Sequence, residues 1–207
     1  MNIIKASYSI IDELKGHDIL KKIELCGRVC YKSEEKITVS SAEKFIVNII
    51  NRGHESVLEH VSFSVRFIVD RGISHEIVRH RIASFSQEST RYCNYGKADE
   101  ITVIEPLFWE STDEEYDKWK RSCEVAEYNY ISLLNDGATP QEARSVLPNS
   151  LKTDIIMTAN IREWRHFLRL RTSQAAHPQI REVTVPLLME LYEVMPVIFE
   201  DIVKLLK

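Results

Sequence analysis

The sequence contains little glycine, proline or cysteine, with 6, 6 and 4 residues among 207. So little glycine and proline excludes a collagen-like or low-complexity chain. The four cysteines follow no regular pattern, which argues against a disulfide scaffold and favours a reducing, cytoplasmic environment. Cys26 and Cys30 lack a second cysteine or histidine pair at the spacing of a zinc site, so we expect them to be structural thiols.

An excess of positive charge and a long apolar run are also missing. Lys and Arg total 27 against 31 Asp and Glu, a net charge of −4, which disfavours a nucleic-acid coat protein. No stretch reaches the ~18 uncharged apolar residues that a membrane span needs, and the first residues do not resemble a signal peptide. With 44% hydrophobic residues and no repeat or linker, the chain is expected to form one domain over residues 1–207.

The periodicity of apolar residues predicts an α+β domain, in which a few strands alternate with many helices. Helices are expected over 17–31, 41–52, 73–81, 112–135, 139–148, 160–171 and beyond 178, with kinks at Pro186 and Pro196. Strands are expected over 61–70, 101–106 and 151–160. Segment 83–96 has neither period and is predicted to be an ordered loop. The expected helix boundaries are N-caps at Ser40 or Ser41 and at Thr112, and a stop at Gly53.

Arginine is concentrated in two parts of the chain despite the negative net charge. The first group, Arg79, Arg81 and Arg91, flanks a Ser/Gln-rich loop whose hydroxyl, amide and N–H groups can bind a phosphate. The second group is Arg144, Arg162, Arg165, Arg169, Arg171 and Arg181. Pairing with glutamate on a solvated face is the alternative explanation for any one of them. Because acidic residues are scarce in sequence around 165–171, we favour a site for small anions.

Other chemistries find weaker support. HESVLEH at 54–60 only superficially resembles a zinc-protease motif, because position 58 is Leu and His60 lies six residues after His54. Ser89 lacks a G-x-S-x-G elbow, and Cys93 is expected to be an inert thiol. Neither a Rossmann nor a P-loop glycine pattern is present. A bound nucleotide or flavin would therefore depend on Arg, His and Ser side chains and on helix N-termini.

Arg79-His80-Arg81, seven further residues and Ser89 form the pattern R-H-R-x7-S. With segments 54–60, 142–148 and 160–171 in the matching order, the sequence resembles the flavin-dependent thymidylate synthases over most of its length. The resemblance implies an α+β fold around a small antiparallel sheet, with no Rossmann module. It also implies a cytoplasmic homotetramer with active sites shared between subunits, and no metal or nucleic-acid partner.

The implied reaction is the reductive methylation of dUMP to dTMP. The one-carbon donor is 5,10-methylenetetrahydrofolate, the hydride source is FADH2 regenerated by NADPH, and tetrahydrofolate is released. No side-chain nucleophile attacks the pyrimidine in this family, so Ser89 is assigned a binding role. Arg171 is the expected catalytic residue, because a permanently charged guanidinium can donate two hydrogen bonds to a uracil oxygen.

The resemblance also assigns residues to ligands by position. Those expected to bind dUMP are Arg79, Gln87, Glu88 through its backbone, Ser89, Arg91, Arg144 and Arg171. Those expected to bind FAD are His54, Ser56, Glu59, Arg79, His80, Arg81, Ile82, Asn160, Arg162 and His166.

Four positions depart from the family pattern. Glu76 stands where members commonly have Gln, and Cys30 where some have Ser near the flavin. His166 stands where others have Asn, and His177 lies in a segment that differs from members with an earlier His. We expect Glu76 to act indirectly, or to pair with Arg79 or His80 across one helical turn.

Two functions compete with this interpretation. An arginine-rich nucleotide or RNA sensor without catalysis is disfavoured by the negative net charge and by the lack of an interleaved aromatic platform. A metal-dependent hydrolase is disfavoured because the ligand spacing is missing. A yellow protein that NADPH bleaches would favour the enzyme.

Overall fold

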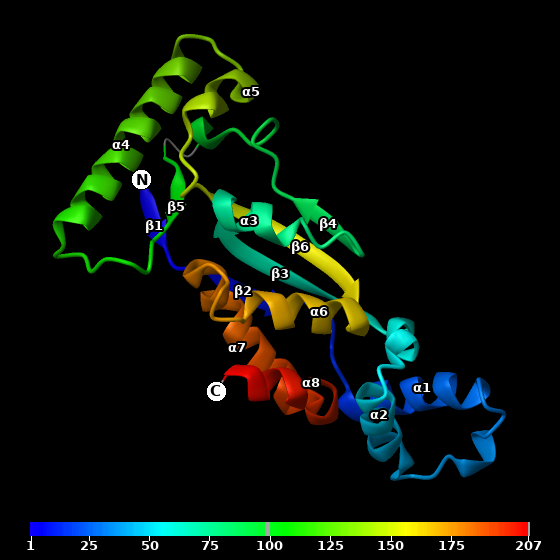
Figure 1. Cartoon of the computed structure of the whole chain (residues 1–207). Helices are drawn as coiled ribbons and strands as arrows, with labels where there is room; N and C mark the ends of the chain where they lie inside the picture. Colours follow the sequence, from blue (N-terminus) through cyan, green and yellow to red (C-terminus); the bar gives the residue numbers. More distant parts are fainter. Residues whose placement is uncertain (98–99, 207) are drawn as a thin grey trace. The chain divides into compact units, whose positions relative to one another are not determined.

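The computed structural model describes residues 1–97 and 100–206, and Figure 1 shows the course of the chain. The chain divides into two compact units. The first unit comprises Met1–Ser7, Arg66–Arg79 and Phe85–Ile156. The second unit comprises Tyr8–Val65, His80–Ser84 and Met157–Lys207. A single domain over residues 1–207 therefore stays a prediction.

A four-stranded sheet has the strand order β2 (Ser7–Ile10), β3 (Ser62–Asp70), β6 (Lys152–Asn160) and β4 (Ala83–Gln87). Side-chain bonds join Ser64 to Thr158 at 2.8 Å and Arg66 to Asp154 at 2.6 Å. The residue number rises along β3 while its partner's number falls along β6, so these neighbours are antiparallel, as their arrows show in Figure 1. The small antiparallel sheet and the strands expected at 61–70 and 151–160 are confirmed.

Burial along β3 and β6 follows the two-residue period that the sequence predicts. Phe63, Val65, Phe67 and Val69 are buried on β3, and alternate residues are buried on β6. Each of these strands, and β4, contributes residues to both units.

The expected loop at 83–96 and the expected helix at 73–81 are both partly wrong. Residues Ala83–Gln87 form β4, which was missed because its alternating residues are mostly small or polar and no member of the strand is fully buried. Helix α3 (Arg71–Ile77) begins earlier than expected, because the Asp70 carboxylate accepts a hydrogen bond from Ile73 N at 2.8 Å. It ends before the Arg79-His80-Arg81 motif.

The first unit also contains a parallel pair of short strands, β1 (Asn2–Ile4) and β5 (Thr102–Ile104). Helix α4 (Glu114–Asn135) packs its buried residues Cys123 and Tyr130 into a core with Ile101, Val103, Ala143 and Leu151. Its N-cap residue is Asp113, so the expected cap at Thr112 is wrong by one position. Helix α5 (Pro140–Ala143) begins with Pro140 as expected and has a Thr139–Glu142 capping box.

The second unit is mainly helical, with α1 (Gly16–Val29), α2 (Ser41–Asn51), α6 (Ile161–Arg171), α7 (Pro178–Val194) and α8 (Pro196–Val203). Trp164 stacks on Phe63 with ring centroids 5.0 Å apart. Pro186 lies inside α7, and the chain breaks before Pro196, where α8 begins. Gly53 adopts φ +70 just after α2, which confirms the predicted stop.

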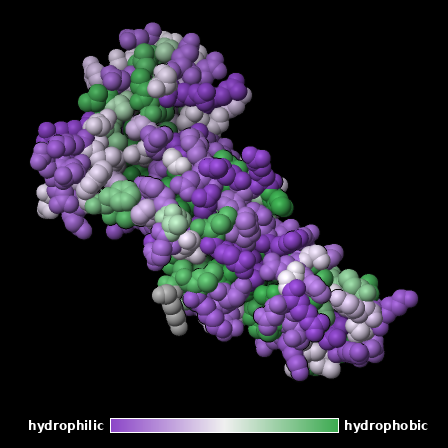
Figure 2. Space-filling model, viewed as in Figure 1, coloured by the Kyte–Doolittle hydropathy of each residue, from purple (hydrophilic) through white to green (hydrophobic). Residues whose placement is uncertain are grey.

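Short 3-10 helices complete the described structure, at Glu34–Lys36, Glu55–His60, Tyr95–Lys97, Arg144–Val146 and Lys204–Leu206. Within residues 1–97 and 100–206, no helix has the length and apolar character needed to cross a bilayer. The face shown in Figure 2 is mainly hydrophilic, with separate hydrophobic patches.

Candidate active site

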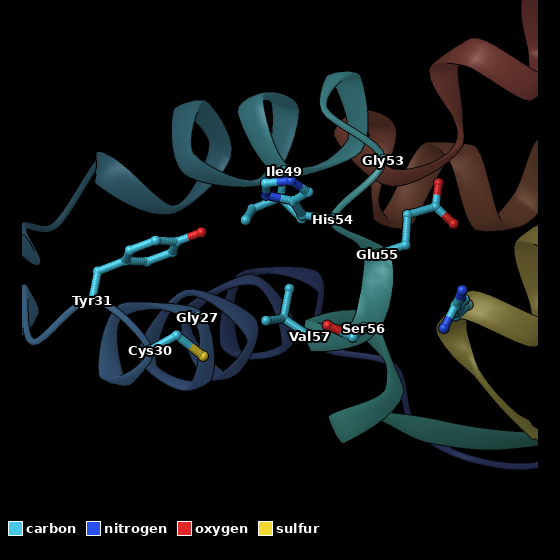
Figure 3. Close-up of a pocket in the computed structure, with 10 residues that line it drawn as sticks. Gly27, Cys30, Tyr31, Ile49, Gly53, His54, Glu55, Ser56 and Val57 are labelled. Carbon is cyan, nitrogen blue, oxygen red and sulfur yellow. The ribbon is translucent and has the colours of Figure 1, made fainter.

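A cavity of about 340 Å³ lies within the second unit (Figure 3). Its size falls at the lower end of the range for small-molecule pockets. Of the predicted flavin residues, His54, Ser56 and Arg162 line it together. The lining residues are Gly27, Cys30, Tyr31, Ile49, Gly53, His54, Glu55, Ser56, Val57 and Arg162.

The cavity brings together the ends of several elements. The end of α1 supplies Cys30 and the following residue, Tyr31, which Figure 3 shows facing the same space as His54. The positive φ of Gly53 turns the chain from α2 into the 3-10 helix that carries Ser56. Sequence reasoning assigned no role to Tyr31, and its place in the cavity depends on packing between α1 and α2.

Arg162 of the cavity forms an ion pair with a further predicted flavin residue, Glu59. Arg162 Nη1 lies 2.6 Å from Glu59 Oε1, and both side chains are about half exposed. Asn160, also predicted to contact the flavin, uses its side-chain oxygen to cap α6 by accepting from Glu163 N at 2.9 Å. The sequence signal for that cap is the Asn that precedes the helix.

Arg165 and Arg169 do not belong to an anion-binding cluster, contrary to the interpretation of the second arginine group. Arg165 is 1% exposed and lies 2.8 Å from Asp201 Oδ2 and 3.1 Å from Glu55 Oε1. Arg169 pairs with the same Asp201 at 3.0 Å. The acidic partners of Arg165 and Arg169 are distant in sequence, so the scarcity of acidic residues near 165–171 wrongly indicated an anion site.

His80 lies at the centre of a buried hydrogen-bond network in the second unit. Its Nδ1 is 3.1 Å from Glu163 Oε1, and its Nε2 accepts from Arg171 Nε at 3.1 Å. His80 and Glu163 are 5% and 6% exposed. Burial lowers the pKa of His80 to about 4, with further contributions from the charges of Arg171 and His166. The network therefore holds a neutral imidazole.

His80, Glu163 and His166 also form a group whose metal-ligating atoms all lie within 4.8 Å of one another. The sequence did not indicate this group, because His80 is far from the other two along the chain. The Arg171 guanidinium donates to His80 Nε2, so that nitrogen faces a positive charge. The arrangement therefore favours a proton on Nδ1 rather than a cation among these groups.

In the first unit, Gln87 and Glu88 are engaged in internal hydrogen bonds. Gln87 Nε2 donates to Ser74 Oγ at 2.8 Å. The Glu88 carboxylate accepts from Tyr95 Oη at 2.8 Å and from Lys152 Nζ at 2.9 Å. Its backbone N–H donates to Asp154 O, and its carbonyl accepts from Arg71. The backbone contact expected from Glu88 to the nucleotide stays a prediction.

The segment after β4 places the Thr90 hydroxyl beside the guanidinium of Arg144. Ser89 Oγ accepts from Arg91 N at 3.3 Å, and Arg144 Nη1 donates to Thr90 Oγ1 at 3.3 Å. The Arg91 guanidinium lies over the Tyr92 ring, 5.4 Å from its centroid. Arg91 and Arg144 are exposed, whereas Thr90 is 7% exposed. Thr90 was missed by sequence reasoning, although it directly follows Ser89, the last residue of the R-H-R-x7-S pattern.

The two sets of predicted ligand residues separate between the units. Of the dUMP set, Arg79, Gln87, Glu88, Ser89, Arg91 and Arg144 belong to the first unit, and Arg171 to the second. Of the FAD set, Arg79 belongs to the first unit, and His54, Ser56, Glu59, His80, Arg81, Ile82, Asn160, Arg162 and His166 belong to the second. Arg79, Arg81 and Ile82 are exposed on either side of the buried His80.

Comparison with known proteins decides the family. Residues 10–197 match the family described as thymidylate synthase complementing protein. The chain belongs to this family. A flavin-dependent thymidylate synthase from Geobacter sulfurreducens is 37% identical over 186 residues, covering 86% of this chain and 80% of that protein. One from Pyrococcus furiosus is 37% identical over 173 residues, covering 82% and 70%.

A solved structure of a member of the same fold agrees with this assignment. The UMP/dUMP methylase PolB from Streptomyces cacaoi, bound with 5-Br dUMP, has a TM-score of 0.79 and 26% identity. The match covers 97% of this chain and 96% of that chain. The expected family and fold are therefore confirmed.

The positions that depart from the family pattern have distinct surroundings. Cys30 lines the cavity, and its thiol donates to Cys26 O at 3.8 Å. His177 is the N-cap residue of α7, and its Nδ1 accepts from Gln179 N at 3.3 Å. His166 is exposed, with its ring centroid 5.6 Å from that of His80. Glu76 is half-buried in α3.

Proposed function

We propose that this protein is an FAD-dependent thymidylate synthase that converts dUMP to dTMP. 5,10-Methylenetetrahydrofolate gives the one-carbon unit, NADPH supplies the reducing equivalents, and tetrahydrofolate is released. The observation that carries the proposal is the convergence of His54, Ser56 and Arg162 on one cavity in a member of this family. The relatives named flavin-dependent thymidylate synthase support the same enzyme class.

The cavity suits one part of a flavin dinucleotide. Aromatic and polar groups converge there, Tyr31 and His54 among them, and Arg162 supplies a cation for a phosphate. With 340 Å³ it accommodates a portion of so large a cofactor, so other predicted FAD residues would bind the rest. When bound, reduced FAD supplies a hydride to the one-carbon unit.

The residues after β4 would bind the nucleotide. Arg91 and Arg144 supply positive charge, and the Ser89 and Thr90 hydroxyls supply further hydrogen bonds to a phosphate. Ser89 binds and does not attack the pyrimidine. Arg79, Gln87 and the backbone of Glu88 complete the proposed dUMP set.

Arg171 would stabilise the reacting pyrimidine. C5 of uracil is a weak nucleophile, and negative charge develops on the carbonyl oxygens as C5 bonds to the methylene carbon. Arg171 donates hydrogen bonds to one of these oxygens. With the C5 proton lost to solvent and tetrahydrofolate departed, reduced FAD held by its predicted residues would supply the hydride that converts the methylene carbon to a methyl group.

We further propose a homotetramer in which different copies of the chain supply residues to one active site. Large hydrophobic side chains on the surface support assembly, among them Tyr128 on α4 at 72% exposed and Val29 on α1 at 57%. Mixing Arg91→Ala and Arg171→Ala variants, at a dUMP concentration too low to saturate Arg91→Ala, should raise the activity above the sum of the two variants measured alone. No recovery after confirmed subunit exchange would contradict shared sites.

The enzyme proposal is tested with purified protein reconstituted with FAD. A yellow protein that NADPH bleaches, and that forms dTMP from dUMP and methylenetetrahydrofolate, is the expected result. Rescue of a thymidine-requiring bacterial strain tests the whole reaction in a cell. A folded protein that binds no flavin, or that oxidises NADPH without forming dTMP, would overturn the proposal.

A further inference from the structure

Helix α6 presents three side chains to His80 along one face. Glu163, Phe167 and Arg171 are spaced four residues apart, so they lie above one another on the helix. The His80 ring contacts the Phe167 ring edge-on at 4.8 Å between centroids, with Glu163 at Nδ1 and Arg171 at Nε2. A long side chain at the end of a helix extends back over the preceding turn, which brings Arg171 to His80.

Hydrogen-bond chemistry fixes the tautomer of His80. An arginine Nε–H can only donate, so His80 Nε2 must be the unprotonated acceptor. The ring proton is therefore on Nδ1 and is donated to Glu163 Oε1. The low pKa of His80 keeps this neutral form through the pH range in which enzymes usually work. A protonated ring would place an N–H against the Arg171 N–H.

The backbone of Arg171 is held as well as its guanidinium. Arg171 is the last residue of α6, and its carbonyl accepts from Thr184 Oγ1 at 3.0 Å. Thr184 is fully buried on α7. Contacts at the backbone carbonyl and at Nε of Arg171 therefore restrict this residue, and the bond at Nε helps to orient the guanidinium.

We propose that Glu163 and His80 form a hydrogen-bonded relay that positions Arg171 for the pyrimidine. His80 and Glu163 are positioning residues here, acting through Arg171. The inference rests on the proposed function, in which Arg171 donates to uracil. It adds a role for His80 beyond a flavin contact, and a role for Glu163, which the sequence did not indicate.

Two substitutions of His80 separate its hydrogen bonds. In His80→Gln the amide reaches the place of Nε2 and retains an acceptor for Arg171, whereas in His80→Asn the amide reaches only the place of Nδ1. At saturating FAD and dUMP, we expect His80→Asn to lower kcat by about 10- to 100-fold, the effect of a misplaced catalytic group. His80→Gln should lower kcat by less than about fivefold, because one neutral acceptor replaces another.

Glu163→Gln tests the outer member of the relay. Its amide can donate to Nδ1 and move the ring proton to Nε2, so kcat should fall about as far as in His80→Asn. Glu193→Gln, exposed on α7, is the matched control and should leave kcat unchanged. Reduction of bound FAD by NADPH without dUMP should keep its wild-type rate in Glu163→Gln and Glu193→Gln, because Arg171 acts on uracil and neither glutamate belongs to the proposed FAD set.

NMR can determine the tautomer of His80 without any measurement of catalysis. In 15N-labelled protein free of ligands, His80 Nε2 should give the shift of an unprotonated nitrogen in the wild type and of a protonated one in Glu163→Gln. Equal kcat losses in His80→Gln and His80→Asn, or a protonated Nε2 in the wild type, would overturn the relay. Failure of the wild type to form dTMP would instead refute the proposed function, and the NMR result distinguishes the two cases.

Discussion

In the second unit, Arg165 and Arg171 are bound by other side chains, Arg165 by Asp201 and Glu55 and Arg171 by His80. In the first unit, Arg144 contacts the Thr90 hydroxyl and Arg91 the ring of Tyr92. Among residues 1–97 and 100–206, no carboxylate forms an ion pair with Arg91 or Arg144. Arg165 and Arg171 of the second unit are thus neutralised or oriented by the protein itself, whereas Arg91 and Arg144 of the first unit keep positive charge that an anionic ligand can neutralise.

This comparison predicts different consequences for mutations in the two units. Removing a buried, paired arginine should reduce stability, because its partners lose their counterion. Removing an exposed arginine near the Ser89 and Thr90 hydroxyls should instead weaken ligand binding, because the folded protein does not depend on it. A guanidinium oriented by a neutral histidine should affect turnover.

Arg165→Met should give the largest loss of stability. Asp201 and Glu55 keep some access to water, with side chains 43% and 21% exposed. We therefore expect a decrease of about 3 kcal/mol in the free energy of unfolding, the low end for breaking a buried pair. Urea unfolding measures it. The control is Arg169→Met, which removes an arginine 46% exposed beside the same Asp201 and should cost less than about 1 kcal/mol. Equal losses of unfolding free energy in Arg165→Met and Arg169→Met would show that the buried pair stabilises the fold no more than the exposed one.

Arg91→Ala and Arg144→Ala should each weaken dUMP binding about 10- to 30-fold, because each removes a charge-assisted hydrogen bond. Titration of the folded protein with dUMP measures the affinity, and raising the salt concentration should reduce the difference from the wild type. Arg121→Ala, an exposed arginine on α4, is the control. Unchanged affinity in both variants would place the phosphate elsewhere.

Acid should destabilise the protein through His80. Its pKa is lowered to about 4 in the folded state, against about 6.5 when unfolded, so the unfolded chain binds more protons between these values. The stability that His80 contributes is present above about pH 6.5 and is lost as the pH falls toward 4. The slope from this one group is at most about 1.4 kcal/mol per pH unit.

The pH dependence is measured by urea unfolding of the wild type and His80→Gln at matched pH values. The variant should lose the part of the slope that belongs to His80, while other titrating groups contribute equally to both proteins. A wild-type slope in His80→Gln would show that the imidazole is not held neutral.

The sequence predicted the elements whose periodicity is strong and missed those stabilised by tertiary contacts. Strands β3 and β6 alternate apolar residues and were placed within one residue, whereas β4 is mostly small or polar and was expected to be a loop. Among site residues, the motif and its flanking segments located His54, Ser56 and Arg162. Glu163 and Tyr31 were missed, because their relation to the site depends on which faces of α6 and α1 pack inward.

Tertiary contacts that local sequence cannot predict also explain why Arg165 and Arg169 were wrongly assigned to an anion site. Local sequence showed few acidic residues near Arg165, yet Asp201 lies 36 positions away and Glu55 lies 110 positions away. Charge clusters in a sequence therefore indicate where anions could bind only after long-range pairs are known. In the described structure Arg91 and Arg144 form no ion pair with a carboxylate and stay candidates for anion binding, whereas Arg165 is paired.

Ser89→Ala should give the smallest effect among the residues of the first unit. Its hydroxyl accepts from Arg91 N at 3.3 Å and is proposed to add one neutral hydrogen bond to the nucleotide. Loss of such a bond weakens binding by about 1 kcal/mol, or about fivefold. The expected result is a higher KM for dUMP with kcat nearly unchanged, and Ser86→Ala on the exposed side of β4 should alter neither. Complete loss of single-turnover chemistry with dUMP bound would instead assign Ser89 a direct chemical role. The first unit would then supply a reacting group as well as positive charge.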